Sequence, residues 1–239
     1  MTAWLDPLRA ALDEAPVTFF FRDDDAGWQD ERLRRLLAVF DRRCVPVDLA
    51  VIPCALGTKL ARELRARGPT VGLHQHGFAH ANHEVEGRKC EFGPSRGEEE
   101  QRRDVEGGRA LLEERLGPAL DPIFTPPWNR CTPTTGRVIA AAGFRVLSRE
   151  SRAPRLGIDG LDELPVHVDW LAHRAGVRLT REELGERLAA HARRGGPIGV
   201  MLHHAVMDDA DLRGVDELLR VVASRAQVAR MAELVPVAA

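Results

Sequence analysis

The chain has 239 residues, 44% hydrophobic and 29% charged, which is the balance of a globular protein with one sizeable core. A formal net charge of −2 gives no electrostatic basis for binding nucleic acid or an anionic membrane surface. The opening residues lack the apolar core of a secretory signal, and no apolar run approaches the roughly 20 residues of a membrane helix. The four cysteines are widely spaced without a C-x-x-C pair. We therefore expect a single cytoplasmic domain over residues 1–239, with reduced thiols and no membrane insertion.

Strand-like and helical segments alternate along the chain. Short apolar, β-prone runs predict strands, and apolar positions at helical spacing predict helices. Strands are expected at 17–21, 45–53, 69–75, 122–126, 144–148, 163–170, 198–204 and 227–231, and helices at 30–43, 56–68, 96–117, 133–142, 180–194 and 209–223. Such alternation predicts a largely parallel α/β architecture, whose sites gather beyond the carboxyl ends of the strands.

Five predicted strand ends carry polar or aromatic residues suited to catalysis. They are Asp23–Asp25, His74–His80, Thr125–Asn129, Asp169–Trp170 and His203–His204. Each motif alone has an ordinary explanation: three aspartates commonly form a solvated turn, and an H-x-x-x-H pair is more often a surface feature than a metal site. Their arrival at one edge of the same predicted sheet favours a functional interpretation.

The residue types point to metal-assisted hydrolysis. His76 and His80 are four residues apart, so one helical turn would place both rings on the same side, and the acidic run 23–25 offers a third ligand. A divalent metal makes its bound water a nucleophile near neutral pH, and hydrolysis also needs a base and an acid. A second aspartate would serve as the base, and His203 or His204 as the acid. His74, two residues before His76 on the same strand face, is expected to line the site.

In chain order, the stretches "RDDDAG", "HGFAH", "FTPPWN", "VDW" and "VMLHH" resemble the motifs of the NodB-type polysaccharide deacetylases, a family of carbohydrate esterases. The resemblance spans about residues 17 to 204. It implies a distorted (β/α) barrel, a divalent metal held by one aspartate and two histidines, with zinc expected, and hydrolysis of an N-acyl group.

The resemblance also implies roles for individual residues. Asp24 matches the catalytic base, His203 the general acid, Asp169 the residue that orients this acid, and Trp128 the aromatic whose backbone N–H helps to form the oxyanion hole. The expected metal ligands are Asp25, His76 and His80, and the residues expected to face the substrate are Trp170, His74, Asn129, Arg130 and His204. A register shifted by one residue, with Asp23 as base and Asp24 as ligand, stays open.

Three departures mark the chain as a divergent branch. Gly77 stands where the family prefers Ser or Thr, and an unusual insert, "HANHEVEGRKCEFGPSR", lies beside the metal histidines. Thr125 replaces the loop arginine that tethers the catalytic aspartate in the family. Arg22 or Arg130 are the candidates to substitute for it.

The leading interpretation is a metal-dependent amidohydrolase that acts on a carbon–nitrogen bond other than a peptide bond. It would remove an acetyl or formyl group from an amino sugar or a sugar-bearing small molecule, with metal-activated water as nucleophile. One alternative is a catalytically inactive, sugar-binding or regulatory relative, which the lost loop arginine motivates. Another is a hydrolase of a non-sugar amide that uses the same metal chemistry.

Overall fold

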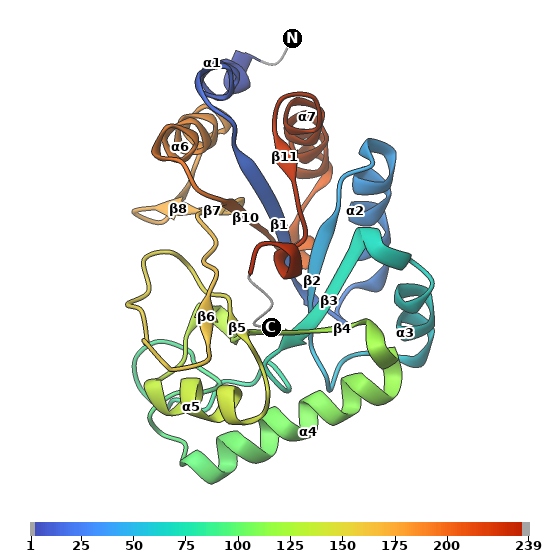
Figure 1. Ribbon diagram of the computed structural model, residues 1–239, viewed down its shortest axis with the longest axis vertical. Coiled ribbons are helices and arrows are strands. Elements are labelled where there is room, and N and C mark those ends of the chain that lie inside the picture. The colour runs from blue at the N-terminus through green and yellow to red at the C-terminus, as the bar shows by residue number, and fades with distance from the viewer. Residues whose placement is uncertain (1–2, 236–239) are drawn as a thin grey trace.

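The computed structural model describes residues 3–235, and within that range one sheet of nine strands curls into a distorted barrel with helices around it (Figure 1). Eight strands lie in the order β6-β5-β4-β3-β2-β1-β10-β7, and β11 pairs with β1. Every pair in this sheet is parallel. The strands are β1 (Thr18–Ala26), β2 (Val47–Val51), β3 (Val71–His76), β4 (Leu120–Thr125), β5 (Val146–Leu147), β6 (Asp162–Glu163), β7 (Val168–Asp169), β10 (Ile198–Leu202) and β11 (Gln227–Val228).

The helices lie outside the curled sheet, as parallel strands joined by crossover helices require. They are α1 (Asp6–Glu14), α2 (Asp30–Arg43), α3 (Thr58–Arg65), α4 (Glu98–Leu116), α5 (Pro133–Ala141), α6 (Arg181–Arg194) and α7 (Asp209–Arg225). The expected α/β barrel is thus confirmed. The sequence analysis did not predict α1, which packs on α6, or the small hairpin of β8 (His173–Arg174) and β9 (Val177–Arg178).

A single segment closes the barrel. The sequence predicted one strand over 163–170, but the structure has two short strands there, β6 paired with β5 and β7 paired with β10. The chain therefore crosses from one edge of the sheet to the other within these residues, and Glu150 and Val166 form an isolated parallel bridge on the way. Pro165 has no N–H to donate to a ladder, which accounts for the break.

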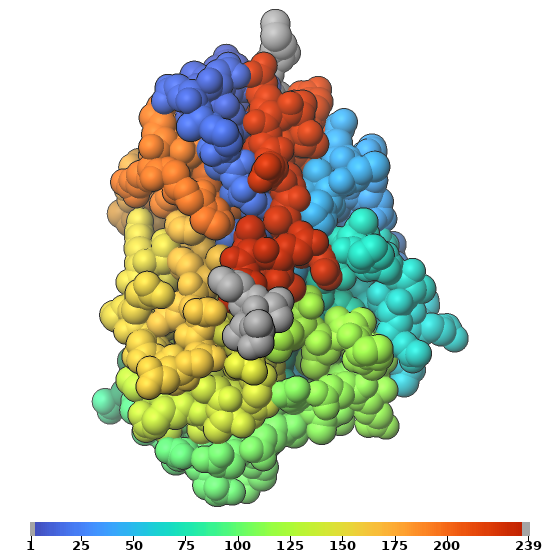
Figure 2. Space-filling model, viewed as in Figure 1, coloured from blue at the N-terminus to red at the C-terminus, as the bar shows by residue number. Residues whose placement is uncertain are grey.

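Alternate strand residues point either outward, toward the helices, or inward, into the barrel. Phe19 and Phe21 point outward into the layer between the sheet and α1, α2, α3, α6 and α7, and a separate cluster lies under α4 and α5. Phe20 points inward, where a third cluster fills the barrel together with Met231. Met231 begins a short 3-10 turn, Met231–Glu233, and the chain after α7 lies across the centre of the face seen in Figure 2. This turn closes the amino end of the barrel, so the opposite end is left for the site.

No helix among residues 3–235 has the length and apolar character needed to cross a membrane.

Candidate active site

Asp25, His76 and His80 converge at the carboxyl end of the barrel. Asp25 lies near the end of β1, His76 is the last residue of β3, and His80 follows in the loop. Nε2 of each histidine lies 3.2 Å from Asp25 Oδ1. Nδ1 of His76 lies 2.9 Å from the carbonyl oxygen of Thr125, so it carries the proton and leaves Nε2 with its lone pair.

This arrangement fits a divalent metal ion. Asp25 Oδ1 is buried and has no hydrogen-bond partner within residues 3–235. With metal–ligand bonds of about 2.0–2.1 Å, tetrahedral geometry separates two ligand atoms by about 3.3 Å, close to the separation found here. Burial raises the pKa of Asp25, but a positive charge on the neighbouring histidine rings lowers it well below the usual range, and a bound cation would act in the same direction. The three side chains could therefore hold zinc or a similar ion.

Arg22 tethers Asp24 inside the barrel. Its Nε and Nη2 donate to the two carboxylate oxygens of Asp24 at 2.8 and 2.9 Å, and its Nη1 donates to Ser148 Oγ at 2.8 Å. Both side chains are almost fully buried. Burial raises the pKa of Asp24, but the charges of Arg22, His76 and His203 lower it, and the net pKa is below the usual value. Asp24 is thus an ionised carboxylate beside the candidate metal ligands.

Of the two candidates to substitute for the family's loop arginine, Arg22 is the one that contacts Asp24. The Nη1 of Arg130 donates instead to the carbonyl of Lys89 at 2.8 Å. Thr125, which stands at the loop position, lies with its Oγ1 2.9 Å from His74 Nε2. The guanidinium therefore reaches the aspartate from two residues earlier on the same strand.

Asp23 forms a different buried pair, with His204. Asp23 Oδ2 lies 2.6 Å from His204 Nδ1, and the other ring nitrogen lies 2.7 Å from the carbonyl oxygen of Trp28. Since both partners only accept hydrogen bonds, the ring carries two protons and a positive charge. Burial opposes this charge, but Asp23 and the Trp28 carbonyl raise the pKa of His204 to about 9. Asp23 pairs with His204, whereas Asp25 contacts His76 and His80, so the geometry favours Asp24 and Asp25 over the shifted register.

His203 lies at the site and is more exposed than its neighbour. Its side chain is 26% exposed, and its Nε2 lies 3.9 Å from Asp24 Oδ2. Asp169 sits on the adjacent strand, where Met201 is its registered partner in β10. Asp169 Oδ1 accepts a hydrogen bond from Leu171 N at 2.9 Å, and residues 3–235 show no hydrogen bond or ion pair between Asp169 and His203. The orienting role of Asp169 stays a prediction.

Two tryptophans flank His80. Trp28 and Trp128 place their rings 4.7 and 4.4 Å from the His80 ring, each edge-on. Trp28 is 39% exposed. Trp128 belongs to a short 3-10 turn, Pro127–Asn129, and has a left-handed backbone with φ of 57°. Its N–H has no hydrogen-bond partner in the described part of the chain, so it is available to a ligand.

Four of the residues expected to face the substrate do not do so. Trp170, which directly follows β7, is fully buried and packs against Trp4 and Arg181 in the helical layer outside the sheet. His204 is buried in its pair with Asp23.

His74 and Asn129 lie beneath the site. Burial, together with the charge of Arg22, lowers the pKa of His74 to about 3, so the ring is neutral. The amide oxygen of Asn129 accepts from Arg22 Nη2 at 2.8 Å. These two side chains support the site from below, and Arg130 remains a candidate for contact with the substrate.

Glu91, in the unusual insert, was not expected from the sequence to be near the site. Its carboxylate is completely buried against the loop that joins His76 and His80. A carboxylate in a glycine-containing, charged stretch is typical of a solvated loop, so no local signal distinguished it.

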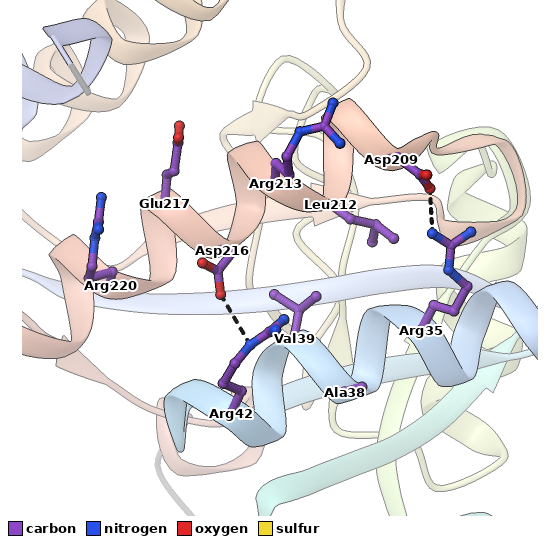
Figure 3. A pocket seen from close by; sticks show the side chains of 10 residues that line it. All are labelled: Arg35, Ala38, Val39, Arg42, Asp209, Leu212, Arg213, Asp216, Glu217 and Arg220. Atoms are coloured by element: carbon purple, nitrogen blue, oxygen red, sulfur yellow. Dashed lines mark hydrogen bonds and ion pairs between the residues drawn. The ribbon is translucent and has the colours of Figure 1, made fainter. Parts of the chain in front are cut away.

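A groove between α2 and α7 lies elsewhere on the molecule. Its charged side chains pair with one another, Asp209 with Arg35 and Asp216 with Arg42 (Figure 3). The residues that line it include none of the candidate metal ligands, so the groove is separate from the candidate active site.

The sequence matches no protein-family profile, and no curated protein matches it. Solved structures do match. A protein from Mycobacterium smegmatis assigned to the polysaccharide deacetylases is 18% identical, with a TM-score of 0.69 over 91% of this chain and 88% of that one. A family 4 acetyl xylan esterase from Clostridium thermocellum, in complex with a cobalt ion, is 14% identical, with a TM-score of 0.59 over 91% and 89%. A mutant of a family 4 carbohydrate esterase pseudoenzyme is also 14% identical, with a TM-score of 0.62 over 92% and 67%.

These likenesses confirm the resemblance at the level of the fold. The chain has the distorted (β/α) barrel of the NodB-type polysaccharide deacetylases, the carbohydrate esterases of family 4.

Proposed function

We propose that the chain is a metal-dependent hydrolase of the NodB-type deacetylase family, which removes an acetyl or formyl group from the nitrogen of an amino sugar or a sugar-bearing small molecule. One observation carries the proposal. Asp25, His76 and His80 converge on a point beside an ionised Asp24 and a partly exposed His203. Ligands, base and acid are the minimum set for metal-assisted hydrolysis of an amide.

Each side chain has a defined task in this proposal. A divalent ion held by Asp25, His76 and His80, with zinc expected, would activate water and polarise the scissile carbonyl. Asp24 accepts the proton of the attacking water, since Arg22 keeps its carboxylate ionised. The free N–H of Trp128 donates to the oxygen on which negative charge develops.

His203 completes the reaction. Its Nε2 donates a proton to the departing amine, and its exposure leaves that nitrogen accessible to the substrate. Asp169 is the candidate to orient this ring, because its strand β7 pairs with β10, and His203 directly follows β10.

The indoles around His80 support a sugar-bearing substrate. Trp28 presents an exposed ring next to a metal ligand, and an aromatic ring provides an apolar surface with a polar N–H. The structural neighbours include an acetyl xylan esterase, which supports the same class of substrate.

The second candidate is an inactive sugar-binding relative. The loss of the loop arginine motivates it, and one structural neighbour is a mutant of a pseudoenzyme. The contact between Arg22 and Asp24 favours catalysis instead, because the carboxylate has a cationic partner despite the loss. Hydrolysis of a non-sugar amide would use the same side chains, so only a comparison of substrates distinguishes it from the first proposal.

The test combines metal titration with a substrate panel. Metal-free protein titrated with Zn²⁺ should bind about one ion per chain. The loaded protein should release acetate or formate from N-acylated amino sugars faster than from ureides or simple amides. Saturable sugar binding without release of acid from any amide would favour the inactive relative, and release from non-sugar amides alone would favour the third interpretation.

A further inference from the structure

The insert that follows the metal histidines turns back toward them. Phe92, next to Glu91 in the chain, is fully buried in the core under α4 and α5 and forms a parallel bridge with Cys131. The carbonyl oxygen of Cys90 accepts a hydrogen bond from His83 N at 3.0 Å. These contacts fix the backbone on either side of Glu91 and direct its side chain at the loop 77–81.

Glu91 binds that loop through three backbone N–H groups. Its Oε1 accepts from Ala79 N at 2.8 Å and from Ala81 N at 3.2 Å, while its Oε2 accepts from Phe78 N at 3.1 Å. The residue is fully buried, and it has no ion pair with any side chain in residues 3–235. The loop's own amides are thus its main counterpart, as in an anion-binding backbone nest.

The glycine at position 77 makes room for this carboxylate. Gly77 has φ of 57°, and a Cβ placed on it would lie 2.1 Å from Glu91 Oε2 and 2.6 Å from the ring of Pro127. A side chain there would expel the carboxylate or the turn that carries Trp128. The absence of Ser or Thr at this position and the presence of Glu91 are therefore two parts of one local arrangement.

His80 depends on the same arrangement. Its backbone is left-handed, with φ of 55°, a conformation that costs free energy for a residue with a Cβ. The hydrogen bonds to Ala79 and Ala81 hold the residues on both sides of it in place. With the backbone so fixed, Nε2 of His80 lies 3.2 Å from Asp25 Oδ1.

We infer that Glu91 is a positioning residue for the metal site: its buried carboxylate fixes the 77–81 loop and so presents His80 as a metal ligand. This inference rests on the metal site proposed above. The carboxylate of Glu91 is not part of the ligand cluster of Asp25, His76 and His80, and it contacts the loop through the backbone N–H groups of residues 78, 79 and 81.

The variant that tests the inference is Glu91→Gln, which keeps the shape of the side chain. Its amide NH₂ would face one of the N–H donors that the carboxylate now satisfies, so the loop should loosen. We expect Zn²⁺ affinity, measured on metal-free full-length protein by competition with a chelator, to fall about 10- to 100-fold. Glu84→Gln is the matched control, because Glu84 belongs to the same insert but accepts hydrogen bonds from Ser95 rather than from the loop. Its affinity should match that of the wild type.

A double-mutant cycle separates positioning from general damage. In a His80→Ala background, Glu91→Gln should weaken Zn²⁺ binding less than twofold further, because the ligand through which Glu91 acts is gone. The absorption spectrum of the Co²⁺-loaded protein should change in Glu91→Gln and stay unchanged in Glu84→Gln.

Two results would overturn the inference while leaving the proposed function intact. One is a Zn²⁺ affinity of Glu91→Gln within twofold of the wild type, and the other is an equal loss in the presence and absence of His80. If the wild-type protein binds no divalent ion, the proposed function fails and this inference fails with it.

Discussion

The two ends of the barrel interior bury aspartates in opposite electrostatic surroundings. At the carboxyl end, both oxygens of Asp24 accept hydrogen bonds from Arg22. At the amino end, Asp48 is equally buried, yet no cation pairs with it within residues 3–235, and its Oδ1 has no hydrogen-bond partner. Its Oδ2 accepts from the N–H of Met231, the residue that closes this end.

The ionisation of these aspartates differs accordingly. Burial raises the pKa of Asp48 to about 8, although the hydrogen bond from Met231 and the more distant charge of Arg230 lower it, and the charges of Asp121 and Glu233 add to the increase. The net pKa of Asp24, by contrast, is lowered. The same residue type in one barrel thus has a raised pKa at the closed amino end and a lowered pKa at the carboxyl end, where a base is proposed. Arg22 makes the difference.

The largest effect is expected when Arg22 loses its charge. Arg22→Met should make the carboxyl end resemble the amino end, so that the pKa of Asp24 rises and the carboxyl becomes protonated near neutral pH. We expect turnover to fall about 10²- to 10⁴-fold and the acidic limb of the pH–rate profile to move to higher pH. Arg22→Lys, which keeps the charge, should retain the position of that limb. If the turnover of Arg22→Met were within threefold of the wild type, Arg22 would not be what keeps Asp24 ionised.

The second prediction concerns the buried pair of Asp23 and His204. His204→Ala leaves the Asp23 carboxylate buried without its cation, so the free energy of unfolding should fall by about 3–5 kcal/mol. His203→Ala, one residue earlier and partly exposed, should change stability by about 0.5 kcal/mol or less while reducing turnover about 10²- to 10⁴-fold. Denaturant unfolding and acid release measure the two effects. A reversed order of stabilities would contradict the assignment of the two histidines.

The third prediction concerns the effect of Asp48, at the amino end of the barrel, on the pH dependence of stability. A carboxyl whose folded pKa is near 8 and whose unfolded pKa is near 3.8 stabilises the folded state below pH 4, and this contribution is lost as the pH rises toward 8. Asp48→Asn removes that loss. Its stability relative to the wild type should therefore improve by about 3–4 kcal/mol between pH 5 and pH 8, with turnover unchanged. A constant difference across this range would show that Asp48 is ionised throughout.

Much of the site was predictable because the sequence indicates where each strand ends and because parallel strands end at the same edge of a sheet. Apolar runs followed by polar residues located Asp25, His76 and His203 at the carboxyl edge, and the structure brings them together there. Alternation within a strand also indicated that His74 and His76 share a face. That face proved to be the barrel interior, with His74 too deep to meet a substrate.

The remainder depends on contacts between distant parts of the chain. The partner of Arg22 at Ser148 is 126 residues away, and the side to which Trp170 turns depends on how its short strand joins β10. The role of Glu91 depends on an irregular loop that has no periodic pattern. In each case the role of the residue depends on where its side chain points in the folded protein, and the local sequence does not specify this direction.

The central claim is that Asp24 is an ionised base next to, and distinct from, a metal ligand at Asp25. The most direct test measures acetate or formate released per bound metal ion, from N-acylated amino sugars, in the wild type and in Asp24→Asn and Asp25→Asn. Asparagine keeps the shape of aspartate without its basicity, so Asp24→Asn should retain about one ion per chain and lose most of the release. Asp25→Asn should lose the ion itself. Full release per bound ion in Asp24→Asn, or undiminished metal binding in Asp25→Asn, would contradict the account.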